Sequence, residues 1–231
     1  MTHENVAHNR QARGAVAVGA SAGGVEALVQ FAANLPTDLR YPVLAVVHMP
    51  PGAPSVLAQI IDRSGPLHAT AAEDGEMLES GHIYVAVPGR HLLVDGRTVM
   101  LSNGPTENGH RPAINALFRS VALNFGPKAI CVLMSGVLDD GVLGAAAIKA
   151  RGGTTVAQRP ADALFPAMPI NAVQAGVIDH QAAARDMGAL LTQLTRQETS
   201  SLALMGASAP LSACDGLGHN SQTAAGRTGD D

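Results

Sequence analysis

The sequence predicts an α/β fold: a doubly wound, mostly parallel sheet in a Rossmann-like three-layer arrangement, with an antiparallel β-hairpin insertion. Short, Val-rich apolar runs do not alternate with polar residues, as is typical of strands covered on both faces. Segments with helical periodicity lie between these runs. Hydrophobic residues make up 46% of the chain, aromatic residues only 3%, and Trp is absent, so the core must consist of small and branched aliphatic side chains.

Each element follows from the local pattern. The apolar runs predict strands at 15–19, 42–48, 83–87, 129–135 and 154–158, and a shorter one at 176–178. The periodic segments predict helices at 24–34, 54–63, 112–124, 142–151, 167–174 and 181–195. Two short runs within 92–101 flank Asp95-Gly96, a dipeptide that favours a tight hairpin turn.

Length and composition bound the organisation. The 231 residues suit one domain at 14–196, preceded by a polar extension at 1–13 and followed by a tail at 197–231 whose composition predicts disorder. The net charge of −4 offers no basic footprint for nucleic acid. No apolar stretch approaches the ~18 residues of a membrane span, so we expect no membrane insertion and a cytoplasmic protein. Cys131 and Cys214 have neither disulfide-framework nor metal spacing.

The turn after the first predicted strand reads GASAGG and presents Ser21 among small residues. Gly19, Ser21 and Gly23 match the G-x-S-x-G pattern of a nucleophile on a strand-to-helix turn. The same turn fits a helix cap by Ser21, and with Gly24 it differs from a dinucleotide-binding loop by one residue. The turn alone leaves these three interpretations open.

A serine nucleophile needs a base and an acid, and both occur after predicted strands. His48 ends the second strand in VLAVVHMPPG, and Asp139 and Asp140 follow the strand at 129–135. The carboxyl ends of parallel strands share one edge of a sheet, where sites assemble. Taken alone, a histidine at a strand end more often caps the sheet edge or packs under a loop. The aspartates could cap a helix, orient a histidine or bind a metal, and the metal is least favoured because no third ligand is grouped with them.

Five segments in order resemble the catalytic domain of the chemotaxis protein-glutamate methylesterase (CheB) family. They are GASAGGVEAL, VVHMPPG, HRPAINALF, LMSGVLDDGVLGAAAIKARGG and VAQRPADALFPAMPINAV, and the resemblance runs from about residue 14 to residue 195. It implies a doubly wound parallel sheet that is distinct from the α/β-hydrolase fold. The chain order agrees, because Ser21, His48 and Asp140 follow one another here, whereas α/β-hydrolases run Ser, acid, His.

The resemblance also implies a role for each residue. Ser21 would attack a glutamyl γ-methyl ester, His48 would act as general base and then acid, and Asp140, which precedes the Gly of the family's D-G pair, would orient the imidazole. The backbone N–H groups of Ala22 and Val137 would stabilise the oxyanion. No cofactor and no metal are expected.

Two departures from the family pattern stand out. The loop before the aspartates reads GVLDDG instead of G-M-G-N-D-G, which is similar to members that occur without a regulatory domain. Only a short polar segment precedes the first predicted strand, so we expect no attached receiver domain.

Other residues of the matching segments are less defined. Arg111 precedes Pro112 at a predicted helix start, where a cation is unfavourable, so it could pair with a substrate carboxylate or with Asp139, or face solvent. Met168, in the segment that begins at Phe165, could contact the substrate, although packing is the commoner role. The remaining candidates have no readable partner spacing and are treated as structural or solvated: His68, His82, His91 and His110.

We therefore expect a cytoplasmic serine esterase that hydrolyses glutamate methyl esters on the cytoplasmic domains of methyl-accepting chemotaxis receptors, with glutamine deamidation as an added possibility. The alternative is a CheB-like binding or scaffold module in a sensory pathway. An oxidoreductase ranks third, because the acidic residue expected ~20 positions after a dinucleotide loop is represented only by Asp38.

Overall fold

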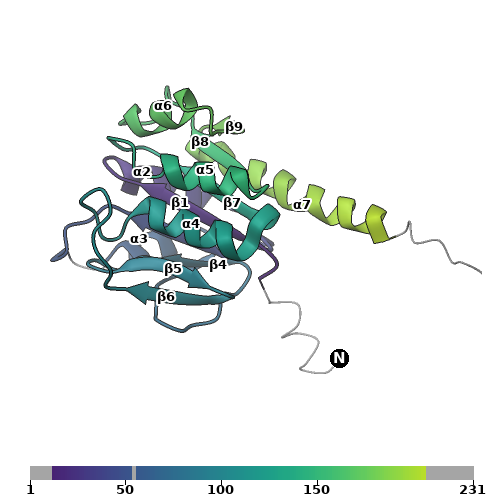
Figure 1. The fold of residues 1–231 in the computed structure, drawn as a ribbon, viewed down its shortest axis with the longest axis horizontal. Coiled ribbons are helices and arrows are strands. Elements are labelled where there is room, and N and C mark those ends of the chain that lie inside the picture. Colours follow the sequence, from purple (N-terminus) through teal and green to yellow (C-terminus); the bar gives the residue numbers. More distant parts are fainter. Residues whose placement is uncertain (1–11, 54–55, 207–231) are drawn as a thin grey trace, which may run out of the picture.

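A computed structural model describes residues 12–53 and 56–206, with side chains through residue 196. Its main sheet has seven strands in the order β3-β4-β2-β1-β7-β8-β9, and every neighbouring pair is parallel. Figure 1 shows β1, β7, β8 and β9 of this sheet together with the helices that pack on it. The strands are β1 (Ala15–Ala20), β2 (Val43–Val47), β3 (His68–Ala71), β4 (His82–Val85), β7 (Ala129–Leu133), β8 (Thr154–Gln158) and β9 (His180–Ala182). The predicted fold class is confirmed.

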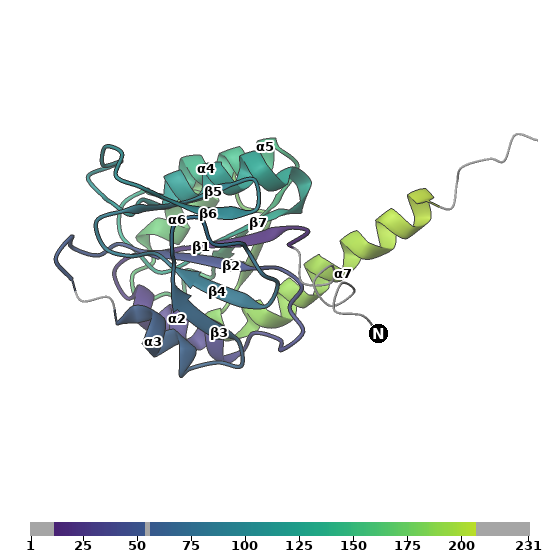
Figure 2. The same ribbon diagram turned by 90° about the horizontal axis from the view of Figure 1, so that it is seen from below.

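Helices cover both faces of this sheet, as Figure 2 shows. One face carries α2 (Gly24–Ala33), α3 (Leu57–Asp62) and α7 (Met187–Gly206). The other carries α4 (Ile114–Phe125), α5 (Val142–Ala150), α6 (Ala167–Gln174) and the antiparallel hairpin of β5 (His91–Asp95) and β6 (Thr98–Ser102). The predicted hairpin insertion is therefore present.

Strand β1 shows why its sequence is apolar at every position. Val16 and Val18 pack into the cluster under α2, while Ala15 and Ala17 pack into the cluster under α4. All six residues of β1 are buried. A strand covered on both faces has no solvent side, so alternation is lost.

Two edge strands differ from the predictions. The strand expected at 176–178 is a turn and loop, and β9 forms instead at His180–Ala182. Val177 and Ile178 pack against the core without joining the sheet. Strand β3 lies at the opposite edge and was not predicted, because its sequence HATA lacks a run of large apolar residues.

The last helix also differs. It was expected at 181–195, but β9 and a short 3-10 helix (Ala184–Asp186) occupy that start, and α7 begins at Met187 and continues to Gly206. Residues 197–206 are therefore helical, where a disordered tail was expected to begin. The remaining expectations for 1–11 and 207–231 lie outside the described residues. Among the described helices, none is long and apolar enough to cross a bilayer.

Candidate active site

Three neighbouring strands bring the predicted residues to one edge of the sheet. β1 lies between β2 and β7, with Ala20 opposite Val47 and Gly19 opposite Leu133. Ser21 and His48 directly follow β1 and β2, and Asp140 lies in the loop after β7. Residues far apart in the chain therefore meet where these strands end.

The side chains form one hydrogen-bonded series. His48 Nδ1 lies 3.1 Å from Ser21 Oγ, and His48 Nε2 lies 2.7 Å from Asp140 Oδ2. The His48 side chain is only 7% exposed and that of Asp140 only 2%. The sequence-based grouping of these three residues is thus matched by their geometry.

The first turn of α4 holds the Asp140 carboxylate. Oδ2 accepts a second hydrogen bond from Ile114 N–H at 2.7 Å, and Oδ1 accepts one from Asn115 N–H at 3.1 Å. Free N–H groups at a helix N-terminus favour an anion. Burial alone would raise the pKa of Asp140, but the hydrogen bonds from His48, Ile114 and Asn115 outweigh it and lower that pKa.

An ionised Asp140 fixes the tautomer of His48. A carboxylate only accepts hydrogen bonds, so Nε2 of His48 must carry its proton toward Asp140. Nδ1 then has a free lone pair, which accepts the hydroxyl proton of Ser21. The ring is oriented with Nδ1 toward the serine, the reverse of the arrangement in chymotrypsin-type triads.

The turn that carries Ser21 is pinned by Ser135, a fully buried residue that the sequence reasoning did not single out. The backbone of Ser135 accepts from Ser21 N–H at 2.9 Å, and its hydroxyl donates to the Ala22 carbonyl at 2.9 Å and accepts from Phe165 N–H at 2.9 Å. Gly23 adopts φ +66°, a left-handed conformation that suits glycine. A polar residue ending a buried strand was the available signal for Ser135.

Ala22 and Val137, whose backbone N–H groups were expected to stabilise the oxyanion, lie on the segments next to Ser21. Neither backbone N–H donates to another residue in the described part of the chain. Gly136, which precedes Val137, comes so close to Ser21 that a Cβ on it would lie 3.0 Å from the serine Cβ. Both N–H groups therefore belong to segments that adjoin Ser21.

Two capping interpretations are wrong. Ser21 does not cap α2, because Gly23 is the N-cap residue and no side chain bonds the free N–H groups there. Asp139 does not cap α5, whose N-cap residue is Gly141, and its side chain is exposed. At the start of α5, the Asn115 amide oxygen accepts hydrogen bonds from Gly141 N–H and Gly144 N–H at 3.0 and 2.7 Å.

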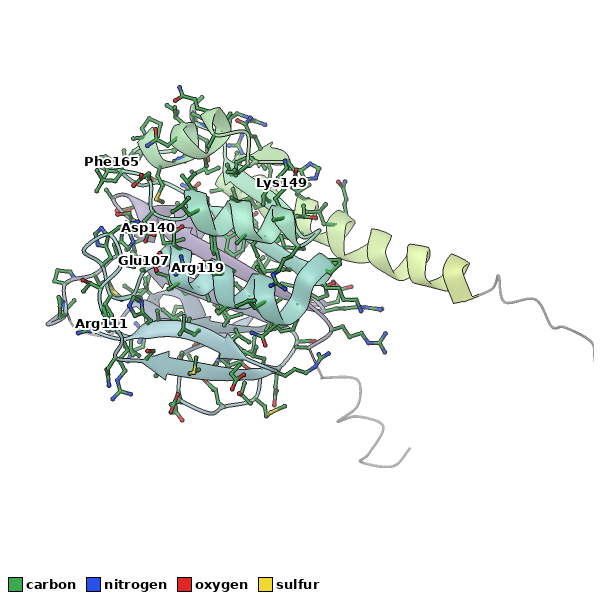
Figure 3. All side chains as sticks on the ribbon, in the orientation of Figure 1. Glu107, Arg111, Arg119, Asp140, Lys149 and Phe165 are labelled. Atoms are coloured by element: carbon green, nitrogen blue, oxygen red, sulfur yellow. The ribbon has the colours of Figure 1, made fainter. Side chains whose placement is uncertain are left out.

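Arg111 does not pair with Asp139. Its Nη1 donates to the backbone carbonyls of Asn103 and Gly104 at 3.1 and 2.8 Å. Figure 3 shows Arg111, Glu107, Asp140 and Phe165 toward one end of the molecule. Arg111 therefore stabilises the loop between β6 and α4 through these two hydrogen bonds.

Met168 has a packing position. It has no exposed surface and belongs to the apolar cluster under α4. Its backbone N–H donates to the Gly136 carbonyl at 3.0 Å. Met168 therefore packs against the loop beside Ser21 and has no exposed surface for contact with a substrate, while Phe165 is 41% exposed.

The four histidines set aside as structural or solvated have different surroundings. His91 is buried and bonded to the Pro105 carbonyl and Ala113 N–H. His68 bonds Asp62, and His82 bonds Thr70. His110 stacks on His48 with ring centroids 3.6 Å apart, so it belongs to the site.

A pocket of about 320 Å³ opens beside this histidine pair. Its walls include His48, Met49, Pro50, Thr106, His110 and Arg111. Among the described residues, no group of three or more His, Cys, Asp or Glu could hold a metal ion. The arrangement has the parts of a serine nucleophile with a base and an orienting acid.

Comparisons with known proteins agree with this geometry. The model of the CheB methylesterase family matches residues 16–191. The chain is 35% identical over 191 residues to a protein-glutamate methylesterase/protein-glutamine glutaminase 2 of Koribacter versatilis, covering 80% of this chain and 53% of the relative. It is 38% identical over 184 residues to a protein-glutamate methylesterase/protein-glutamine glutaminase of Geobacillus kaustophilus, covering 78% and 53%.

A solved structure is similar along almost its whole length. The crystal structure of the Thermotoga maritima CheB methylesterase catalytic domain matches with a TM-score of 0.76 and 30% identity, over 78% of this chain and 98% of that one. The chain spans about half the length of the curated relatives it matches. The order of Ser21, His48 and Asp140, the parallel sheet that aligns them and these matches agree: the chain belongs to the CheB methylesterase family.

Proposed function

We propose that the protein is a serine esterase that hydrolyses glutamate γ-methyl esters on the cytoplasmic domains of chemotaxis receptors. The observation that carries the proposal is the continuous series Ser21 Oγ, His48 Nδ1, His48 Nε2 and Asp140 Oδ2, with contacts of 3.1 and 2.7 Å. The substrate class comes from the relatives, which are named protein-glutamate methylesterase/protein-glutamine glutaminase.

The acylation step uses the free lone pair of His48. Nδ1 takes the hydroxyl proton of Ser21 as Oγ attacks the ester carbonyl, and a tetrahedral oxyanion forms. The resulting imidazolium is stabilised by Asp140. His48 then gives the same proton to the departing methoxide, methanol leaves, and the glutamyl group stays esterified to Ser21.

Deacylation repeats these steps with water. His48 removes a proton from water as its oxygen attacks the acyl carbonyl, and then returns that proton to Ser21 Oγ. The products are the free glutamate side chain and the regenerated serine. A glutamine side chain would follow the same route, with ammonia leaving in place of methanol.

The oxyanion would be bound by the backbone N–H groups of Ala22 and Val137. Support comes from their position on the two segments that adjoin Ser21 and from the absence of an acceptor for either group in the described part of the chain. A donor of this kind contributes ~3 kcal/mol of transition-state stabilisation. The change from G-M-G-N-D-G to GVLDDG keeps these backbone groups and alters only side chains.

Exposed apolar side chains surround the nucleophile and favour a protein substrate. Val137, Leu138, Leu164 and Phe165 are 41%, 62%, 66% and 41% exposed. A Cβ on Gly23 would lie about 3.0 Å from both Leu164 and Phe165, so these side chains lie directly beside the Ser21 turn. An apolar rim of this kind suits docking of a helix surface that carries the ester.

Release of methanol from purified methylated receptor tests the proposal, with the Ser21→Ala variant as the comparison. The wild-type protein should release methanol, and the variant should not. A binding or scaffold module would bind the receptor equally well in both forms and release none from either. That second result would overturn the esterase proposal while leaving the family membership intact.

A further inference from the structure

The ring of His110 stacks on the ring of His48. The ring centroids are 3.6 Å apart and the planes are inclined by only 6°. We propose that His110 is a positioning residue, whose aromatic face holds the His48 imidazole in the plane that joins Ser21 Oγ to Asp140 Oδ2. This proposal rests on the proposed role of His48 as the base.

A tight turn presents His110. Glu107 and His110 exchange backbone hydrogen bonds of 3.0 and 2.9 Å across Asn108 and Gly109. Asn108 has φ +51° and Gly109 has φ +78°, the positive pair of a type I′ turn, for which Asn-Gly is the preferred sequence. The backbone of His110 is therefore fixed relative to Glu107.

Helix α4 anchors this turn. Arg119 Nη1 and Nη2 each lie 2.6 Å from a carboxylate oxygen of Glu107, a two-point contact that fixes direction as well as distance. Glu107 and Arg119 lie side by side in Figure 3. The same helix holds Asp140 through the N–H groups of its first turn. Helix α4 thus positions both the residue that stacks on His48 and the carboxylate that bonds it.

The chemistry of the reaction favours a neutral ring in this position. His48 becomes an imidazolium when it takes the serine proton, and an aromatic face within about 6 Å attracts a cation. A second charged imidazole would repel it. Partial burial and the nearby His48 lower the pKa of His110, with Asp140 acting in the opposite direction, so the neutral form is favoured.

Three substitutions separate positioning from proton transfer. His110→Phe keeps the aromatic face without nitrogen atoms, His110→Ala removes the face, and His110→Leu keeps bulk without a face. The control is His180→Ala, a change at an exposed histidine on β9. Two rates are measured for each: methanol release with its kcat and KM, and covalent labelling of Ser21 by a fluorophosphonate, which needs no receptor.

The Ala and Leu variants should lower kcat and the labelling rate by ~10-fold or more with KM within ~2-fold, because a transition-state contact is lost. The Phe variant should stay within ~3-fold of wild type, since its face still contacts the cation. The control should match wild type. Thermal unfolding checks that each variant is folded.

Other patterns overturn either the positioning role or the function on which it rests. Equal losses in the Phe and Ala variants would mean that His110 acts through its nitrogen atoms, and no loss in any variant would remove its role. Unlabelled wild-type Ser21 would refute the His48 base on which the proposal depends. If labelling of Ser21 depends on an aromatic ring at position 110 but wild type releases no methanol, the positioning role stands and only the proposed substrate is refuted.

Discussion

Replacing Asp140 by Asn removes one charge from the site and leaves its shape. With the amide oxygen in the Oδ2 position, His48 Nε2 and Ile114 N–H both keep their acceptor at 2.7 Å, while the amide NH2 group faces Asn115 N–H and cannot accept its hydrogen bond. The attraction between a carboxylate and the imidazolium formed on His48 is lost. For unit charges about 4 Å apart and an effective dielectric constant of about 20, that attraction is about 4 kcal/mol. The expected loss in kcat is therefore ~10³-fold.

Methanol release from methylated receptor and fluorophosphonate labelling of Ser21 both measure this loss. The matched control is Asp139→Asn, which removes the same charge from an exposed neighbour and should change kcat by less than ~2-fold. Thermal unfolding verifies that both variants fold. Equal rates for the two variants, or a lower rate for Asp139→Asn, would refute the assignment of Asp140 as the orienting acid.

Three further predictions follow from the same structure. Ser21→Ala and His48→Ala should each lower kcat by at least ~10³-fold, and the double variant should be hardly worse, because the residues act as one unit; near-normal methanol release would contradict this. Gly23→Ala should lower the free energy of unfolding by at least about 1–2 kcal/mol, because its backbone is left-handed and the added Cβ would lie 2.9 Å from Ser135 Oγ, whereas Gly52→Ala, where a Cβ meets nothing within 4 Å, should change it little. Burial raises the pKa of Asp179, but hydrogen bonds from a lysine and a threonine outweigh it and lower that pKa. Its stabilisation is complete above its unfolded pKa of about 3.9 and is lost as the pH falls through the lower folded value, so Asp179→Asn should flatten the acid limb of the unfolding curve; an unchanged limb would contradict this.

The central strands could be predicted because a strand buried on both faces consists of apolar residues throughout. Ile130 and Val132 face one cluster while Cys131 and Leu133 face the other, so β7 is apolar throughout. The edge strands β3 and β9 lack such an apolar run. His180 and Gln181 of β9 are exposed and join the sheet by backbone pairing with β8, which any side chain permits.

The site was predictable where each residue directly follows a strand. Ser21 and His48 are placed by the ends of β1 and β2, and those ends are visible in the sequence. The partners that fix Asp140 and His48 come from α4 and from the turn before it, and their positions depend on how that helix packs. Nothing in the spacing of His110 indicates a stack on His48, because a separation of 61 intervening residues carries no distance information.

The strand order has a consequence for the protein during its synthesis. Ser21 and His48 leave the ribosome with β1 and β2, and β4 and β3 complete that side of the sheet, while Asp140 emerges only after β7. A nascent chain that ends at β4 therefore carries the nucleophile and the base without the carboxylate or the helix that holds it. Domains fold largely as units from the N-terminus during translation. The series of Ser21, His48 and Asp140 can therefore be complete only after β7 has paired with β1.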